Sequence, residues 1–230
     1  MDSNRRIAII AGVLFIIGTI AGILSVVPAI DTPRYLITAA ANANQVILGA
    51  VFQFIMAVVY VGIAITLYPV LRKYNENLAL GFLSFRIIAA VFIIIGVIGL
   101  LLLLTLSQKF IKAGTPDPSY FHTFGSLLQT GRDLVNHVAM ILSLSVGGLM
   151  FYFLLYQAKL VPVWLSVFGF IGNILAILAS LLVMFQTIDI ITTVYLVLFF
   201  PIALQEMVLA IWLIVKGFNL STKTEINQTN

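Results

Sequence analysis

The sequence has no cysteine, only two histidines and very few charged side chains. Without cysteine, the chain forms no disulfide, thiolate nucleophile, iron–sulfur cluster or cysteine-ligated zinc site. A catalytic zinc usually takes three protein ligands, often histidines, and a membrane haem usually takes two facing histidines, so we expect no metal and no cofactor. The 12 basic residues are scattered among apolar runs, which excludes a nucleic-acid-binding surface.

Apolar residues make up 62% of the 230-residue chain and charged residues 9%, with a mean hydropathy of +1.15. Soluble domains carry about a quarter of charged residues, so this chain cannot cover a globule with a wettable surface. The composition therefore predicts an integral membrane protein in contact with the lipid bilayer.

Division of the chain at its charges and turn-forming residues leaves six apolar stretches. Each is long enough, at about 1.5 Å per helical residue, to cross about 30 Å of hydrocarbon. We predict an all-α bundle of six transmembrane helices within one domain, residues 1–230, whose last residues, 217–230, form a polar tail. The predicted helices cover residues 7–30, 46–71, 78–107, 134–157, 161–185 and 192–216.

The distribution of lysine and arginine between the connecting segments predicts the orientation, because cytoplasmic loops are enriched in these residues. With both termini inside, the inner segments hold seven basic residues and the outer segments four. We therefore predict an N-in, C-in topology with a cytoplasmic tail. The first apolar run exceeds the 7–15 residues typical of a signal-peptide core, so we expect it to be a retained helix.

Two longer segments, 31–45 and 108–133, are predicted on the outer side. Within the second, residues 119–129 place apolar and aromatic side chains at helical intervals. They predict either a short helix at the membrane interface or an ordinary structured loop. In the helices, Gly18 with Gly22, and Ser143 with Gly147, have the spacing that allows close helix packing. We interpret both as packing contacts inside the bundle; dimerisation through the first helix is the alternative, and a homo-oligomer is not predicted.

Arg86 and Glu206 are the charged residues that fall deep inside predicted membrane helices. Each costs about 2.5–3.5 kcal/mol at the bilayer centre on insertion scales, so each requires a partner or water. Arg86 lies about 12 Å and Glu206 about 15 Å from the inner ends of their helices. We predict a bidentate pair between them. The pair is open to three interpretations: a structural link between helices, a ligand or substrate site, or part of a proton or ion pathway.

A second polar group, Asp133, Asn136 and His137, lies near the outer start of the fourth predicted helix. Asp133 and His137 are four residues apart and share a helical face, so the carboxylate could orient the imidazole for acid–base chemistry. Alternatively, Asp133 stabilises the helix N-terminus against the macrodipole. Asn173, in the fifth predicted helix, is placed where it could face Arg86.

The sequence does not favour an enzyme. It contains no glycine-rich phosphate-binding loop with a lysine, and no nucleophile elbow or oxyanion signature accompanies His137. The leading hypothesis is a membrane protein that binds or translocates a small amphipathic or anionic molecule, such as a lipid, at Arg86 and Glu206. A structural or partner-binding subunit and a lipid-modifying enzyme are the alternatives.

Three segments carry a resemblance to a known family: residues 80–86 (LGFLSFR), 160–169 (LVPVWLSVFG), and 200–206 (FPIALQE) with 212–218 (WLIVKGF). In these segments and their order the chain resembles the bacterial membrane family called domain of unknown function 4386. The resemblance implies a small multi-pass protein of a bacterial plasma membrane and no particular reaction. An acidic residue three positions after the arginine is part of that family's pattern, and here Ala89 stands in its place, leaving Glu206 as the membrane carboxylate available to Arg86.

The topology can be tested with single cysteines, because the chain has no cysteine of its own. We expect Asp117→Cys to react with a membrane-impermeant thiol reagent added outside intact cells, and Lys73→Cys to react only after permeabilisation. The opposite pattern would reverse the orientation.

Overall fold

The computed structural model describes residues 2–114, 118–190 and 192–219, and every regular element in these ranges is helical. Within them, six helices are long and apolar enough to span a membrane, which confirms the all-α, six-helix prediction. The N-in, C-in orientation stays a prediction. The spans are α1 (Ser3–Leu24), α3 (Ala43–Leu71), α4 (Glu76–Ala113), α6 (Met140–Gln157) with the helix before it, α7 (Val163–Met184) and α8 (Thr193–Val215).

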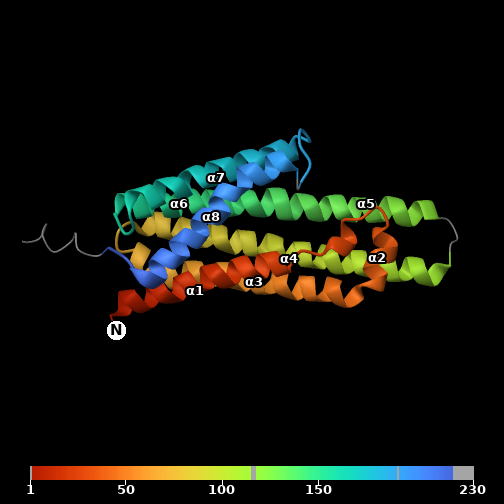
Figure 1. The fold of residues 1–230 in the computed structure, drawn as a ribbon, viewed down its shortest axis with the longest axis horizontal. Helices are drawn as coiled ribbons and strands as arrows, with labels where there is room; N and C mark the ends of the chain where they lie inside the picture. The colour runs from red at the N-terminus through yellow and green to blue at the C-terminus, as the bar shows by residue number, and fades with distance from the viewer. Residues whose placement is uncertain (1, 115–117, 191, 220–230) are drawn as a thin grey trace, which may run out of the picture.

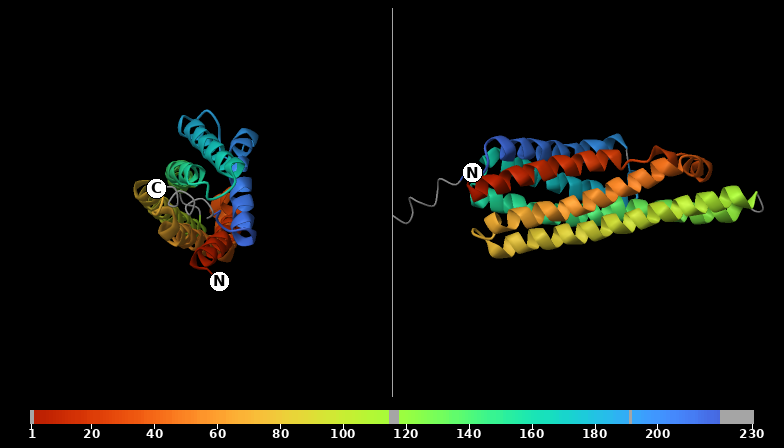
Figure 2. Two further views of the ribbon diagram at one scale, coloured as in Figure 1. Left: turned by 90° about the vertical axis from the view of Figure 1, so that its left-hand side faces the viewer. Right: turned by 90° about the horizontal axis from the view of Figure 1, so that it is seen from below.

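The long helices form a closed ring, in which α1, α3, α4, α6, α7 and α8 each contact the next and α8 returns to α1 (Figures 1 and 2). Their inward faces make one buried core that includes Phe15, Ile63, Phe82, Phe151 and Leu209. Many isoleucine, leucine and valine side chains are exposed on the outward faces. An apolar exterior of this kind suits hydrocarbon and not water.

Local sequence signals explain several helix ends. The Asn75 side chain accepts a hydrogen bond from the Leu78 N–H at 3.0 Å and caps the start of α4. Gly114 ends α4 in the left-handed conformation, with φ of 58°, which glycine adopts without strain. The Thr192 hydroxyl accepts from the Tyr195 N–H at 3.4 Å at the start of α8.

In the predicted outer segment 108–133, residues 108–113 and 118–133 are helical. Helix α4 continues to Ala113, α5 covers Pro118–Leu134, and the π-helical turn η2 (Val135–Ala139) joins α5 directly to α6. Of the two alternatives for residues 119–129, the ordinary loop is therefore wrong, because these residues are helical; the helix is part of the longer α5 and not a separate short element. Asp117, chosen for the labelling test, lies outside the described residues, as does the tail from residue 220 onward.

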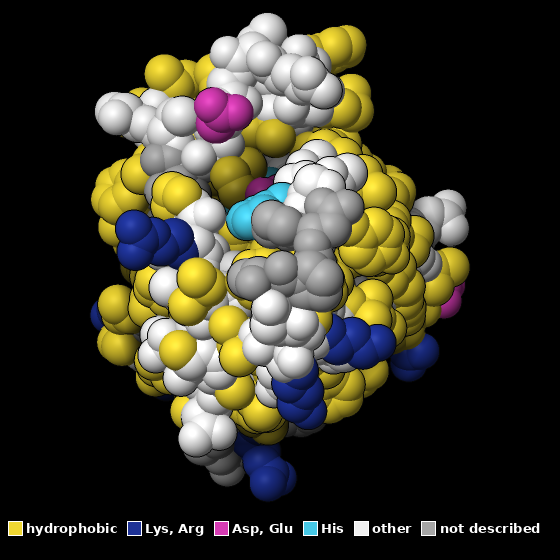
Figure 3. All heavy atoms as spheres, turned by 90° about the vertical axis from the view of Figure 1, so that its right-hand side faces the viewer, with side chains coloured by type: hydrophobic (Ala, Val, Ile, Leu, Met, Phe, Trp, Pro, Cys, Tyr) yellow, Lys and Arg dark blue, Asp and Glu magenta, His cyan; other side chains and the backbone are white. Residues whose placement is uncertain are grey.

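The ends of α4 and α5 form a helical arm that projects beyond α7 and α8 (Figure 1). Helix α4 has 38 residues and so measures about 57 Å, well above the roughly 30 Å of hydrocarbon in a bilayer. Helix α2 (Tyr35–Ala41), in the expected 31–45 region, packs against α4 of this arm. The short turn η1 (Pro28–Ile30), where the first predicted helix was expected to end, is joined to the arm by Gln129 of α5, whose side-chain nitrogen donates to the Ile30 carbonyl. The Ser107 hydroxyl of α4 donates to the Leu36 carbonyl at 2.5 Å. Viewed from this end, lysine and arginine side chains lie around the tip and apolar side chains cover the flanks (Figure 3).

Helices α1 and α8 are held together near the chain termini. The Arg5 guanidinium donates to the carbonyls of Leu213, Ile214 and Val215 at 3.1, 2.6 and 3.1 Å, and thereby satisfies the last carbonyls of α8. At Gly12, a Cβ atom would lie only 2.7 Å from the Ala210 carbonyl oxygen, so the two backbones cross closely there.

The small-residue positions predicted as packing contacts face other helices of the same chain. Gly18 faces Tyr60 of α3, Gly22 faces Met56 of α3, and Gly147 faces Phe85 of α4. Ser143 instead donates to the Ala139 carbonyl one turn earlier in its own chain segment, at 2.8 Å.

The close approach of α7 to α8 at Gly172 generates a stability prediction. A Cβ atom on Gly172 would lie 3.1 Å from both the Cα and the N of Ile202, which are backbone atoms and cannot rotate away. We expect Gly172→Ala to lower the free energy of unfolding by about 1–3 kcal/mol through overpacking. Thermal unfolding of the purified protein in detergent measures the change.

Gly131→Ala is the matched control, since it is the same substitution in a helix with no atom within 4 Å of the new Cβ. It is expected to leave stability unchanged or raise it by about 0.5–1 kcal/mol. Equal unfolding temperatures for the two variants would contradict the close α7–α8 contact.

Candidate functional site

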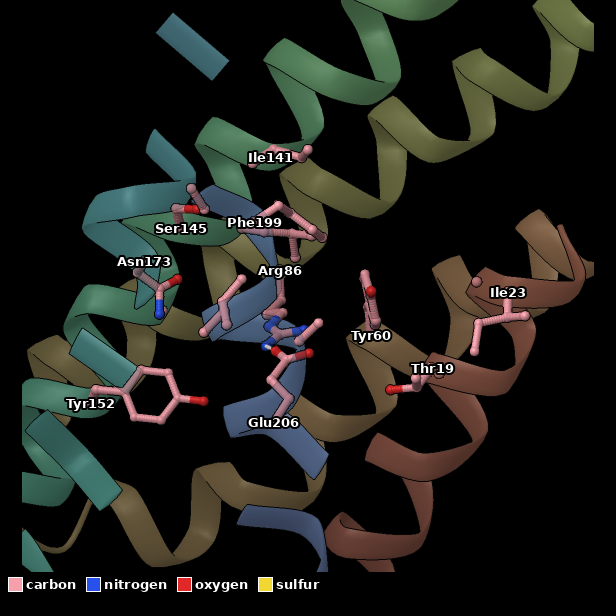
Figure 4. A pocket seen from close by; sticks show the side chains of 17 residues that line it. Thr19, Ile23, Tyr60, Arg86, Ile141, Ser145, Tyr152, Asn173, Phe199 and Glu206 are labelled. Carbon is pink, nitrogen blue, oxygen red and sulfur yellow. Dashed lines mark hydrogen bonds and ion pairs between the residues drawn. The ribbon is translucent and has the colours of Figure 1, made fainter. Parts of the chain in front are cut away.

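Arg86 of α4 and Glu206 of α8 meet inside the ring of helices. Arg86 Nη2 lies 3.4 Å from Glu206 Oε1, and the two side chains are 4% and 22% exposed (Figure 4). The structure thus brings together the two charged residues expected to pair. The predicted bidentate geometry is wrong, because one nitrogen and one oxygen make the contact.

Aromatic rings surround the Arg86 guanidinium. Its central carbon lies 5.0 Å from the ring centroid of Tyr60, 5.3 Å from that of Phe82 and 5.9 Å from that of Phe15. A cation held over aromatic faces is stabilised by about 0.5–2 kcal/mol per favourable contact. The faces of these rings compensate the charge of the guanidinium without accepting strong hydrogen bonds from it.

The hydrogen-bonding capacity of Arg86 is not satisfied by the protein. A guanidinium has five N–H donors. The Nε–H of Arg86 is buried without a hydrogen-bond partner among the described residues, and the single contact to Glu206 is long for a charge-assisted hydrogen bond, which is usually about 2.7–2.9 Å. A buried donor left unsatisfied costs about 1–3 kcal/mol or more for a charged group. Among the described residues, Arg86 therefore keeps an unused Nε–H donor in a buried site.

A cavity of about 230 Å³ lies beside the pair. All six long helices contribute to its wall, which is mostly apolar. The polar side chains in this wall, apart from Arg86 and Glu206, belong to Thr19, Tyr60, Ser145, Tyr152 and Asn173 (Figure 4).

Asn173 lines this cavity, in the Arg86 region where the sequence suggested it could lie. Its side-chain nitrogen donates to the Gly169 carbonyl of its own helix at 2.7 Å. Gly148 of α6 makes room for it, because any Cβ there would overlap the Asn173 amide. The amide is thus held in place between α6 and α7.

The group Asp133, Asn136 and His137 lies apart from the cavity, at the junction of α5 and α6. His137 Nδ1 pairs with the Tyr195 hydroxyl at 2.9 Å, and the Ser180 hydroxyl donates to the His137 carbonyl at 2.9 Å. Asp133 accepts from Arg132 at 3.4 Å. Asn136, also buried, packs against Gly96 of α4.

Both interpretations offered for Asp133 are wrong. The first relied on regular α-helical spacing between Asp133 and His137, but the π-helical turn η2 lies in this stretch. Asp133 pairs with Arg132 and His137 with Tyr195. The second placed Asp133 at a helix N-terminus, whereas the helix already begins at Pro118. Nearby, outside the membrane spans, burial raises the pKa of the Asp31 carboxyl, and the Arg132 charge opposes this rise.

Several polar residues at the site carry no prediction from the sequence. Among them are Tyr60 and Tyr152, which line the cavity, and Gln205, which contacts Tyr152. The Tyr152 hydroxyl donates to Gln205 Oε1 at 2.5 Å, and Gln205 Nε2 donates to the Leu165 carbonyl at 3.1 Å. Gln205 is fully buried and links α6, α7 and α8 below the cavity. Its position next to Glu206 was the one available signal, since tyrosines are common in apolar helices.

The Arg86–Glu206 pair generates a second stability prediction. We expect Arg86→Met and Glu206→Gln each to lower the free energy of unfolding by about 3 kcal/mol. The first variant leaves the Glu206 carboxylate without a partner charge in a low-dielectric site, and the second leaves the Arg86 guanidinium without one. The double variant should lose clearly less than the sum of the two, as for directly interacting residues. Chemical or thermal unfolding in detergent measures this cycle, with the exposed Arg72→Met as control. Strictly additive losses would show that the two side chains do not interact.

Comparison with known proteins assigns the chain to a family but identifies no activity or ligand. No curated protein and no solved structure matches the chain. The family model described as "Domain of unknown function (DUF4386)" matches residues 10–217. Because this match extends from within α1 to just beyond α8, the chain belongs to the DUF4386 family.

Proposed function

We propose that this multi-pass membrane protein binds a small amphipathic or anionic molecule beside Arg86 and Glu206. The observation that carries the proposal is the buried Arg86 Nε–H, which has no partner among the described residues and belongs to a side chain that lines a cavity. An acidic group in the cavity would accept hydrogen bonds from the guanidinium. Ionisable residues within membrane spans are by default candidates for functional sites.

The cavity volume limits the size of the molecule. Pockets for drug-sized ligands usually measure about 300–1,000 Å³, and an engineered cavity of about 150 Å³ holds benzene. At about 230 Å³, the cavity suits a small molecule or the head group of a lipid, and not an entire lipid.

Translocation is an extension of the same proposal. Glu206 lies near the middle of the 23-residue α8, which places the site about halfway across a bilayer. Substrate sites of secondary transporters lie at such depths, where access can alternate between the two sides. Pro201 lies inside α8, between the cavity-lining residues Phe199 and Ile202, and provides a point at which this helix can bend.

A structural role for the pair is the second candidate. Arg86 and Glu206 connect α4 to α8, and the pair contributes to the alignment of these helices whether or not a ligand binds. We place the protein in the plasma membrane of a bacterium. Its helical spans support this location, because outer-membrane proteins are β-barrels.

Ligand-induced stabilisation tests the proposed function. The protein, purified in an uncharged maltoside detergent, is heated with laurate, a single-chain phospholipid or inorganic phosphate. We expect at least one amphiphile with an acidic group to raise the unfolding temperature of the wild type. At a ligand concentration of 100 times Kd, binding stabilises the folded state by about 2.7 kcal/mol. The stabilisation should vanish in Arg86→Met and persist in Arg72→Met.

Two results would contradict this function. One is the same ligand-induced shift in Arg86→Met as in the wild type. The other is a wild type that no amphiphile with an acidic group stabilises.

A further inference from the structure

The cavity has a side that reaches the lipid-facing surface between α1 and α8. The two helices touch at Gly12 and Ala210, and beyond this crossing α1 packs on α3 through Gly18 and Gly22. In Figure 1, α8 leaves α1 at the crossing and runs toward α7. The separation of α1 from α8 thus begins where the cavity lies.

The residues on the two sides of this gap line the cavity. On α1 they are Gly18, Thr19, Gly22 and Ile23, and on α8 they include Phe199, Ala203 and Glu206. Ile23 is 68% exposed, so one edge of the cavity lies at the surface of the bundle. Figure 4 shows Thr19 and Ile23 on one side of Arg86 and Glu206, and Asn173 and Tyr152 on the other. Since this surface belongs to two membrane-spanning helices, its surroundings are lipid hydrocarbon.

The charge of the site restricts the head group. Arg86 and Glu206 are the charged residues among those that line the cavity, and together they are neutral. A simple anion added beside Arg86 would leave one uncompensated negative charge in a low-dielectric site, at a penalty of several kcal/mol. A head group with one negative and one positive charge would leave the site neutral. Glu206, with one long contact and partial exposure, has oxygen lone pairs available for a cation.

We propose that the ligand is a zwitterionic single-chain lipid that enters from the bilayer between α1 and α8. Its acidic group binds Arg86, its protonated amine binds Glu206, and its hydrocarbon chain stays in the gap and the surrounding lipid. The cavity of about 230 Å³ holds the head group alone. This inference rests on the proposed function and names its ligand class.

A change of selectivity tests the charge argument. The wild type and Glu206→Gln are titrated in maltoside detergent with lysophosphatidylethanolamine and with lysophosphatidic acid of equal chain length. The wild type should bind the zwitterionic lipid about tenfold or more tightly, a difference of about 1.4 kcal/mol. Glu206→Gln should reverse the preference, because the site then carries one net positive charge and no partner for the amine. A purely structural role of Glu206 produces no reversal.

Access from the bilayer is tested on α1. Thr19→Trp fills the gap from a cavity-lining position, whereas Ile20→Trp places the same ring on the exposed neighbouring position, which does not line the cavity. Thr19→Trp should weaken binding of lysophosphatidylethanolamine about tenfold or more, and Ile20→Trp should not. Glycerophosphoethanolamine, the water-soluble head group without a chain, should bind at least about tenfold more weakly than the lipid.

The outcomes separate the inference from the proposed function. The inference fails alone if the wild type prefers lysophosphatidic acid, if Glu206→Gln keeps the wild-type preference, or if the chainless head group binds as well as the lipid, while Arg86→Met still abolishes binding. If Arg86→Met binds every probe as the wild type does, or if no probe binds the wild type, the proposed function fails with it.

Discussion

A charge placed in lipid hydrocarbon requires compensation, and the interior of this protein is arranged around that requirement. Helices α4 and α8 are not neighbours in the ring, yet Arg86 of one and Glu206 of the other form the ion pair. The two side chains therefore reach toward each other across the middle of the bundle. Side chains that span the middle in this way prevent the remaining helices from closing on it, and the cavity is the space left beside them.

The contacts around the pair divide the bundle into a fixed part and a part with space. At one end, Arg5 and the Gly12 crossing hold α8 against α1, and Gln205 joins α6, α7 and α8 through Tyr152 and Leu165. Past the crossing, α1 packs against α3 instead of α8. The side of the cavity between α1 and α8 thus begins at the Gly12 crossing, a close contact that positions Glu206. Entry between the two helices does not require this contact to open.

Hydropathy was sufficient to predict the six spans, and the expense of charge in lipid was sufficient to identify Arg86 and Glu206. Hydropathy could not predict the arm of α4 and α5, because the polar residues of 108–133 are typical of loops as well as of helices outside the membrane. The depths of the two residues along their helix axes predicted that the pair would meet. They do not define the rotation of each helix, so they could not distinguish the single contact from a bidentate one. Tyr60 and Tyr152 carry no signal in an apolar sequence, because their roles depend on which helices become neighbours in space.

The geometry of the pair bears on its role. A pair selected only to join two helices would be expected to use short, bidentate hydrogen bonds, since these return the most of the desolvation penalty. Arg86 and Glu206 instead share one contact of 3.4 Å. The Arg86 Nε–H has no partner within the described part of the chain, and a cavity lies beside both groups. The pair by itself therefore recovers only part of the desolvation penalty of its charges. A molecule that satisfies these donors and acceptors would recover it, which is the thermodynamic condition for a binding site.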